Sequence, residues 1–80
     1  MRKIIYLKNA YNTLSVYDKD TRKRIIEGVE GIPQGDIKKL QGEKYPPLYR
    51  LRVGKYRIIY LIEQDEIVIV KIDTRGDIYK

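Results

Sequence analysis

The sequence predicts a small single α+β domain, in which an N-terminal strand and two helices pack on a mainly antiparallel sheet that ends in a three-stranded meander. Two amphipathic helical stripes early in the chain and three β-rich runs in its last part predict this class. The 80 residues show no internal repeat and no shift in composition, which fits one domain over residues 1–80 with one modest core.

The N-terminal part is expected to supply the first strand and both helices. Residues 3–7 form a β-rich run, and Asn9 after it is a candidate N-cap. Apolar residues then recur with helical spacing in two stripes: Ala10, Leu14 and Tyr17, followed by Ile25, Val29 and Ile32, with Ile26 beside them. The polar cluster at residues 18–21 ends the first helix and caps the second, which glycine and proline end between residues 31 and 35.

Glycine, proline and lysine dominate residues 35–47, which are therefore predicted to form a connector. Residues 37–40 within it are an option for one further short strand. Three lysines of this connector would either contact phosphates or simply keep the surface soluble, and the sequence leaves both options open: Lys38, Lys39 and Lys44.

The meander is predicted from consecutive β-rich runs at residues 48–53, 56–63 and 67–73. A two-residue Gly-Lys turn with glycine first joins the first two runs, and such a turn fixes their register. In that register Leu51 faces Ile58 on the core side, and Arg52 lies directly across from Arg57 on the other side. Tyrosines on the core side are expected to be half-buried there with their hydroxyls at the rim: Tyr49, Tyr56 and Tyr60.

Arg50, Arg52 and Arg57 are thus predicted to share one face of the sheet. Like charges directly opposite each other on adjacent strands destabilise a sheet, so a polyanion bound to this face explains them better than a solvated basic surface. The chain has 17 basic and 11 acidic residues, a net charge of +6 and a pI near 9.6. This balance suits nucleic acid, an acidic protein, or both in turn.

The last strand allows two registers. A two-residue loop at residues 64–65 would bring Lys71 to the core side, where an unpaired ammonium group is costly to desolvate. We therefore expect a three-residue loop at residues 64–66, which places Val68, Val70 and Ile72 in the core and sends Lys71, Asp73 and Arg75 to the arginine face, with Asp73 opposite Arg57. The same register exposes aliphatic residues beside the arginines, namely Ile59, Leu61, Ile67 and Ile69, and predicts an amphipathic partner helix that covers them.

The composition also limits the chemistry. Without cysteine there is no disulfide, and without histidine as well, a zinc site, a serine-histidine triad and two-histidine ribonuclease chemistry are disfavoured. The longest apolar runs are too short to span a bilayer, and the N-terminus lacks the apolar stretch of a signal peptide. We expect a cytoplasmic protein that needs no metal and no cofactor.

Three segments of the chain resemble the RelE/ParE superfamily of bacterial and archaeal toxins: K-L-Q-G from Lys39, L-Y-R-L-R-V-G-K-Y-R-I-I-Y from Leu48, and I-V-I-V-K-I-D-T-R-G-D-I-Y from Ile67. The resemblance implies a RelE-like fold and the toxin of a type II toxin-antitoxin pair. In the RelE branch such toxins cut mRNA in the ribosomal A site, and a cognate antitoxin neutralises them by wrapping around the same fold. The implied partners are therefore an acidic antitoxin with an amphipathic helix, the ribosome and mRNA.

The family's catalytic positions fall on Arg50, Arg52 and Arg57 in the sheet, on Arg75 after the last strand and on Tyr79 near the C-terminus. The resemblance implies that Arg57 and Arg75 hold the reacting phosphate, that Arg52 and Arg50 neutralise the RNA backbone, and that Tyr79 stacks on a base or orients the leaving oxygen. For RNA binding we expect contacts from Arg50 together with the lysines: Lys38, Lys39, Lys44, Lys55 and Lys71.

Two departures from the family pattern concern proton transfer. Some members have lysine at the first two basic positions, but Arg50 and Arg52 stay protonated and are poor bases. Thr74 stands where the family often has histidine. The proton-transfer groups are then supplied by the ribosome or RNA, or the enzyme relies on electrostatics, or it is slow. Two other functions stay open: a ParE-like inhibitor of DNA gyrase that cuts no nucleic acid, and a basic nucleic-acid-binding protein without toxicity.

Overall fold

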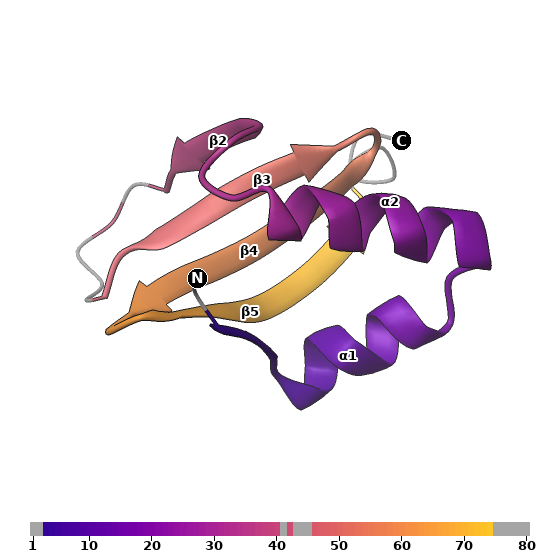
Figure 1. The fold of residues 1–80 in the computed structure, drawn as a ribbon, viewed down its shortest axis with the longest axis horizontal. Helices are drawn as coiled ribbons and strands as arrows, with labels where there is room; N and C mark the ends of the chain where they lie inside the picture. The colour runs from indigo at the N-terminus through magenta and orange to yellow at the C-terminus, as the bar shows by residue number, and fades with distance from the viewer. Residues whose placement is uncertain (1–2, 41, 43–45, 75–80) are drawn as a thin grey trace.

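The computed structural model describes residues 3–40, 42 and 46–74. Two helices lie on one face of a five-stranded sheet, in front of it in Figure 1. The elements in chain order are β1 (Lys3–Tyr6), α1 (Lys8–Ser15), α2 (Lys19–Glu30), β2 (Asp36–Lys39), β3 (Leu48–Val53), β4 (Tyr56–Glu63) and β5 (Glu66–Thr74). The predicted α+β class, with its N-terminal strand, two helices and final meander, is confirmed.

The sheet has the strand order β1-β5-β4-β3-β2. β1 runs parallel to β5, and the other neighbouring strands are antiparallel. The chain therefore crosses from one edge of the sheet to the other through the two helices, and β2 confirms the optional short strand in the connector. Neither helix in the described residues is long and apolar enough to cross a membrane.

The two helices begin in different ways. Asp18 caps α2 by accepting hydrogen bonds from the Thr21 backbone N–H at 3.4 Å and the Thr21 hydroxyl at 2.5 Å. These bonds lower the pKa of the Asp18 carboxyl, so its contribution to stability is complete at neutral pH and is lost as the pH falls through the lowered pKa.

The expectation of an N-cap at Asn9 is wrong, because α1 begins at Lys8 and Leu7 occupies the cap position without a side-chain hydrogen bond. The Leu7 N–H donates to the Ile69 carbonyl at 3.0 Å, and the Leu7 carbonyl accepts from Tyr11 N–H at 2.8 Å. The chain thus turns directly from strand pairing into the first helical turn, which leaves no room for a cap at Asn9.

The core lies between the helices and the sheet. Among the described residues it comprises ten buried side chains: Ala10, Leu14, Ile25 and Val29 from the helices, and Leu51, Ile58, Tyr60, Ile67, Ile69 and Ile72 from the sheet. At Gly28 a Cβ atom would lie 2.7 Å from Cγ2 of Val53, so glycine permits the close approach of α2 to β3. Tyr17 and Ile32 lie just beyond the helix ends but still pack against this core.

A β-bulge sets the register of β5. Glu63 pairs with Glu66, so the turn has two residues, and the prediction of a three-residue loop is wrong. Tyr60 pairs with Ile69, but Ile59 pairs with Lys71, which leaves Val70 as an extra residue on β5. The bulge shifts the inward and outward alternation by one residue in the middle of the strand.

The shift reverses the sides predicted for four residues. Ile67 and Ile69 are buried in the core, at 2% and 0% exposure, rather than on the arginine face. Val68 and Val70 are only half-buried, contrary to the prediction that they belong to the core. After the bulge the predicted order returns, with Ile72 in the core. Both predicted registers are therefore realised, each in one half of β5.

The turn between β4 and β5 provides a first testable prediction. Gln64 has a φ of 56°, a left-handed conformation that favours glycine. We expect Gln64→Gly to raise the free energy of unfolding by about 0.5 to 1 kcal/mol, measured by urea denaturation. Gly54, whose φ is 59° in the preceding turn, supplies the control, because Gly54→Ala is expected to lower stability. Equal or lower stability of Gln64→Gly contradicts the prediction.

Candidate functional site

The face of the sheet opposite the helices, called the open face below, contains two rows of charged side chains that run across β2, β3, β4 and β5. The residues of these rows alternate along the strands with the buried residues Leu51, Ile58 and Ile72, so they point away from the helices. The first row is Asp36, Arg52, Arg57 and Asp73, and the second row is Lys38, Arg50, Ile59 and Lys71.

A bidentate ion pair forms at one end of the first row. Arg57 Nε donates to Asp73 Oδ1 at 3.1 Å, and Arg57 Nη2 donates to Asp73 Oδ2 at 3.0 Å. Lys71 Nζ lies 3.8 Å from the same Oδ2 atom. The Arg57 and Asp73 side chains are 29% and 25% exposed, so solvent screens this pair only in part.

A looser ion pair forms at the other end of the row. Asp36 Oδ1 lies 3.5 Å from Arg50 Nη1, and Asp36 Oδ2 lies 3.9 Å from Arg52 Nη1. The Arg50 side chain is only 11% exposed, whereas the Asp36 side chain is 58% exposed. Arg50 Nη1, although ion-paired with Asp36, and Arg52 Nε are buried atoms that make no hydrogen bond within the described part of the chain. Donors of this kind suit an added oxyanion.

The two aspartates change the interpretation of the stacked arginines. Arg52 does lie directly opposite Arg57, as predicted. Each end of the row, however, carries a carboxylate that offsets the repulsion, so the fold does not need a bound polyanion to tolerate this pair. The two rows together hold five basic and two acidic residues, a net charge of 5 − 2 = +3. The site therefore keeps a positive charge after internal pairing.

The rest of the open face is apolar. A third row across the strands consists of Leu48, Leu61, Val68 and Ile5, and Val70 and Ile59, the apolar member of the second row, extend this surface to the arginines. All six residues are half-buried although neither α1 nor α2 covers them. The predicted apolar surface beside the arginines is thus present, but Val68 and Val70 contribute to it in place of Ile67 and Ile69.

Not every basic residue predicted for RNA binding lies in the two rows. Lys38 and Lys71 do, whereas Lys39 pairs with Tyr49 and shares its helix-covered side. Lys55 is exposed in the turn, with its Nζ 5.6 Å from the ring centroid of Tyr56, which also faces the helices. Lys44, Arg75 and Tyr79 lie outside the described residues.

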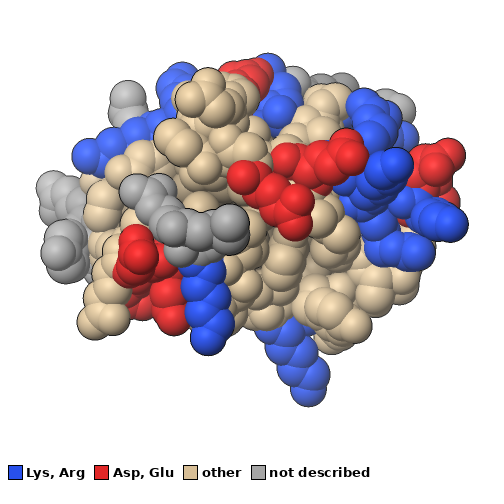
Figure 2. Space-filling view, in the orientation of Figure 1, with Lys and Arg blue, Asp and Glu red and all other residues tan. Residues whose placement is uncertain are grey.

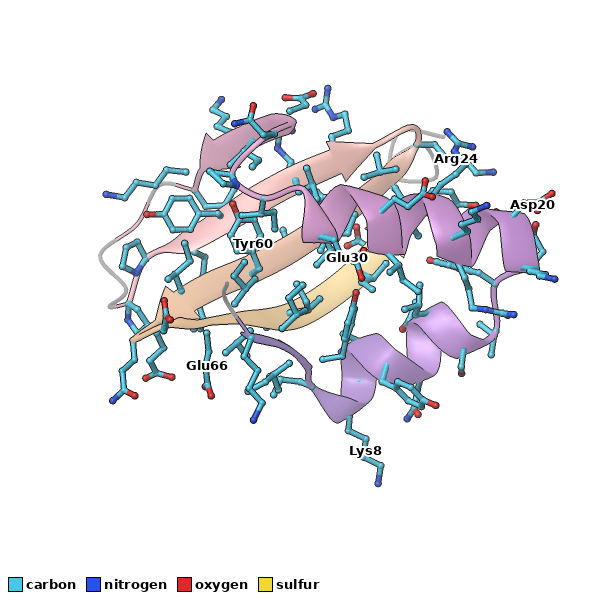
Figure 3. All side chains as sticks on the ribbon, in the orientation of Figure 1. Lys8, Asp20, Arg24, Glu30, Tyr60 and Glu66 are labelled. Atoms are coloured by element: carbon cyan, nitrogen blue, oxygen red, sulfur yellow. The ribbon has the colours of Figure 1, made fainter. Side chains whose placement is uncertain are left out.

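The tyrosines of the sheet pack on the helix side, as predicted. Tyr49 stacks on Tyr60 with ring centroids 5.4 Å apart, and Tyr56 meets Tyr17 at 5.0 Å. Tyr49 and Tyr56 are half-buried, as expected, whereas Tyr60, labelled in Figure 3, is 2% exposed, so the expectation that it is half-buried with its hydroxyl at the rim is wrong. Burial raises the pKa of Tyr17, and Tyr56 and Asp73 raise it further, so this hydroxyl stays protonated at neutral pH.

Charge is distributed differently on the helix side. Figure 2 shows acidic side chains near the centre of that side, with basic side chains mostly around its rim. One acidic residue there, Glu30 at the end of α2 (Figure 3), adds to burial in raising the pKa of Tyr6. The ion-paired rows described above belong to the opposite face, which makes that face the candidate functional site.

Sequence reasoning missed Asp36 as a member of the site. It lies on β2, which pairs with β3 only after a connection that spans residues 40–47. A connection of that length does not define the register between its two strands, unlike the two-residue turn between β3 and β4. The sequence therefore contained no signal that Asp36 lies beside Arg52.

Comparison with known proteins relates this sequence and fold to toxins. The family model described as "ParE toxin of type II toxin-antitoxin system, parDE" matches residues 4–79. A chain of the archaeal RelE-RelB complex from Pyrococcus horikoshii OT3 is 30% identical, with a TM-score of 0.77 over 94% of this chain and 96% of that chain. A chain of the RelB-RelE antitoxin-toxin complex from Methanococcus jannaschii is 29% identical, with a TM-score of 0.73 over 94% of each chain.

A more distant structure shares the fold alone. The YoeB dimer from Staphylococcus aureus has a chain that is 21% identical, with a TM-score of 0.72 over 88% of this chain and 92% of that chain. No curated protein matches the sequence.

Proposed function

Because this chain belongs to the ParE toxin family of type II toxin-antitoxin systems, within the RelE/ParE superfamily, we propose that it is a toxin that cleaves mRNA in the ribosomal A site. The family match covers residues 4–79, and two archaeal RelE-RelB complexes contain a chain that is about 30% identical. The activity proposed is that of a metal-independent endoribonuclease.

The observation that carries the proposal is the arrangement of Arg50, Arg52 and Arg57 on the open face. They lie in two adjacent rows of one sheet, and the helices do not cover them. Guanidinium groups present planar donor forks that match the oxygens of a phosphodiester. Inhibition of gyrase by binding alone does not require such a constellation, so the arginines favour RNA cleavage.

In the proposed reaction the ribose 2'-oxygen attacks the adjacent phosphorus, and the bond from phosphorus to the 5'-oxygen breaks. The products are a 2',3'-cyclic phosphate and a 5'-hydroxyl that takes up a proton. Arg57 and Arg75 hold the phosphate and stabilise the charge that develops on its oxygens, which is a large catalytic term. Arg50 and Arg52 neutralise neighbouring phosphates, and Tyr79 either stacks on a base or orients the leaving oxygen.

Proton transfer in this scheme does not fall on the arginines, because they remain protonated throughout. The tyrosines of the helix side lie on the far side of the sheet from the open face. Either groups of the ribosome or of the RNA accept the 2'-hydroxyl proton, or the reaction relies on electrostatic stabilisation, or it is slow.

The same face is the proposed binding surface of the cognate antitoxin. Ile59, Leu61, Val68 and Val70 provide an apolar surface next to the net positive charge of the two rows. An amphipathic antitoxin helix with acidic flanks complements both properties, and it would exclude RNA from the arginines while bound.

Inhibition of DNA gyrase is the second candidate, because the matching family model bears the ParE description. One experiment separates the two functions. After induced expression, primer extension on a translated message reports cleavage, and plasmid supercoiling in the same cells reports gyrase activity. We expect new 5' ends within the translated region and unchanged supercoiling. The same message without its start codon is the control, and it should stay intact.

Intact message together with a loss of supercoiling would instead establish the gyrase function. Normal growth with neither change would instead support the third function, a basic nucleic-acid-binding protein without toxicity.

A further inference from the structure

We infer that Asp73 and Asp36 occupy two phosphate subsites of the arginine row in the free protein, and that RNA phosphates must displace these carboxylates to bind. The inference rests on the proposed function and extends it, because it assigns the two aspartates the role of setting the affinity for RNA. Neither residue is given a role by the proposed reaction itself.

The geometry at Asp73 carries the argument. Both oxygens of its carboxylate engage the Nε and Nη2 donors of Arg57, at 3.1 and 3.0 Å. A carboxylate and a phosphodiester each present two oxygens with a shared negative charge, so both fit the same guanidinium fork. A phosphate that approaches Arg57 through this fork meets Asp73 already bound there, as well as its negative charge.

Asp36 repeats the arrangement at the other end of the row with weaker contacts. It bridges Arg50 and Arg52 at 3.5 and 3.9 Å, and its side chain is 58% exposed, compared with 25% for Asp73. The bidentate pair should therefore compete with phosphate more strongly than the bridging one. This difference predicts the order of effects when each aspartate is neutralised.

The two subsites explain why the face is stable without RNA. With both carboxylates in place, the repulsion between Arg52 and Arg57 is offset on either side. The same carboxylates weaken the attraction of a polyanion unless it displaces Asp73 from Arg57 and Asp36 from Arg50 and Arg52. We therefore expect them to lower the affinity for nucleic acid while preserving the fold.

The test measures binding of a single-stranded 2'-O-methyl RNA oligonucleotide, which cannot be cleaved by the proposed reaction, using fluorescence anisotropy. We expect Asp73→Asn to bind this probe about fivefold more tightly than wild type, and Asp36→Asn to give a smaller gain. Circular dichroism of each variant verifies that it is folded.

Glu66→Gln is the matched control for the change in charge. Glu66 begins β5 (Figure 3), and its pairing with Lys3 and Glu63 puts it at the end of the sheet away from the arginine rows. The substitution also removes one negative charge, and we expect it to change affinity less than twofold. An equal gain for Glu66→Gln and Asp73→Asn would show that only net charge matters and would overturn the inference.

The double variant Arg57→Ala/Asp73→Asn tests whether the gain acts through Arg57. We expect it to bind no more tightly than Arg57→Ala, because the fork that Asp73 blocks is then absent. Weaker binding by Asp73→Asn alone would mean that Asp73 supports the site rather than competing for it, and would also overturn the inference. Failure of the proposed function gives a different result from failure of the inference. In that case Arg57→Ala would bind the probe as tightly as wild type.

Discussion

Arg57→Ala is expected to lower the rate of mRNA cleavage by about 100- to 1000-fold, the loss that typically follows removal of one preorganised donor to a developing oxyanion. The effect should be larger than at Arg50 or Arg52, because the proposed reaction places Arg57 on the reacting phosphate. The substitution also removes the bidentate ion pair with Asp73, whose carboxylate keeps Lys71 Nζ 3.8 Å away.

Cleavage by this variant is measured by primer extension on a translated message with matched protein levels. Arg24→Ala is the control, because it removes the same charge from α2 on the helix side of the sheet (Figure 3). Arg57→Lys keeps the charge but loses the fork and should recover only part of the activity. Arg75→Ala is the companion variant for the arginine outside the described residues. Undiminished cleavage by Arg57→Ala and by Arg75→Ala would refute the proposed site.

Ile58→Ala is expected to lower the free energy of unfolding by about 3 kcal/mol, within the range found for large-to-small changes in protein cores. Ile58 lies on β4, at the centre of the sheet, is 0% exposed and pairs with Leu51 and Ile72. A domain of this size has a total stability of about 5 to 10 kcal/mol, so the loss should be a large fraction of it. Urea denaturation measures it directly.

The neighbouring residue provides the matched control. Ile59 has the same side chain but points to the open face, where it is half-buried. We expect Ile59→Ala to cost less than about 1 kcal/mol in the free protein and to weaken antitoxin binding instead. Similar losses of stability for both variants would contradict the assignment of the two faces.

The sequence by itself determined the elements of the fold and the central part of the site. Helical spacing of apolar residues identified α1 and α2, and alternation identified the meander, because these periods follow from backbone geometry alone. The Gly54-Lys55 turn fixed the pairing of β3 with β4, so that Arg52 was correctly predicted to lie opposite Arg57. These patterns depend only on residues that are close together in the chain, so they can be recognised in the sequence.

Tertiary structure alone decided two features of the site. The bulge at Val70 lets β5 bury Ile67 and Ile69 before it and still place Asp73 opposite Arg57 after it. Strict alternation of sides along the strand would allow only one of these two arrangements. The pairing of β2 with β3 brought Asp36 to the arginines across a long connection that leaves register undefined. Both features depend on contacts between distant segments, where burial of apolar side chains and pairing of charges are satisfied together only once the sheet has formed.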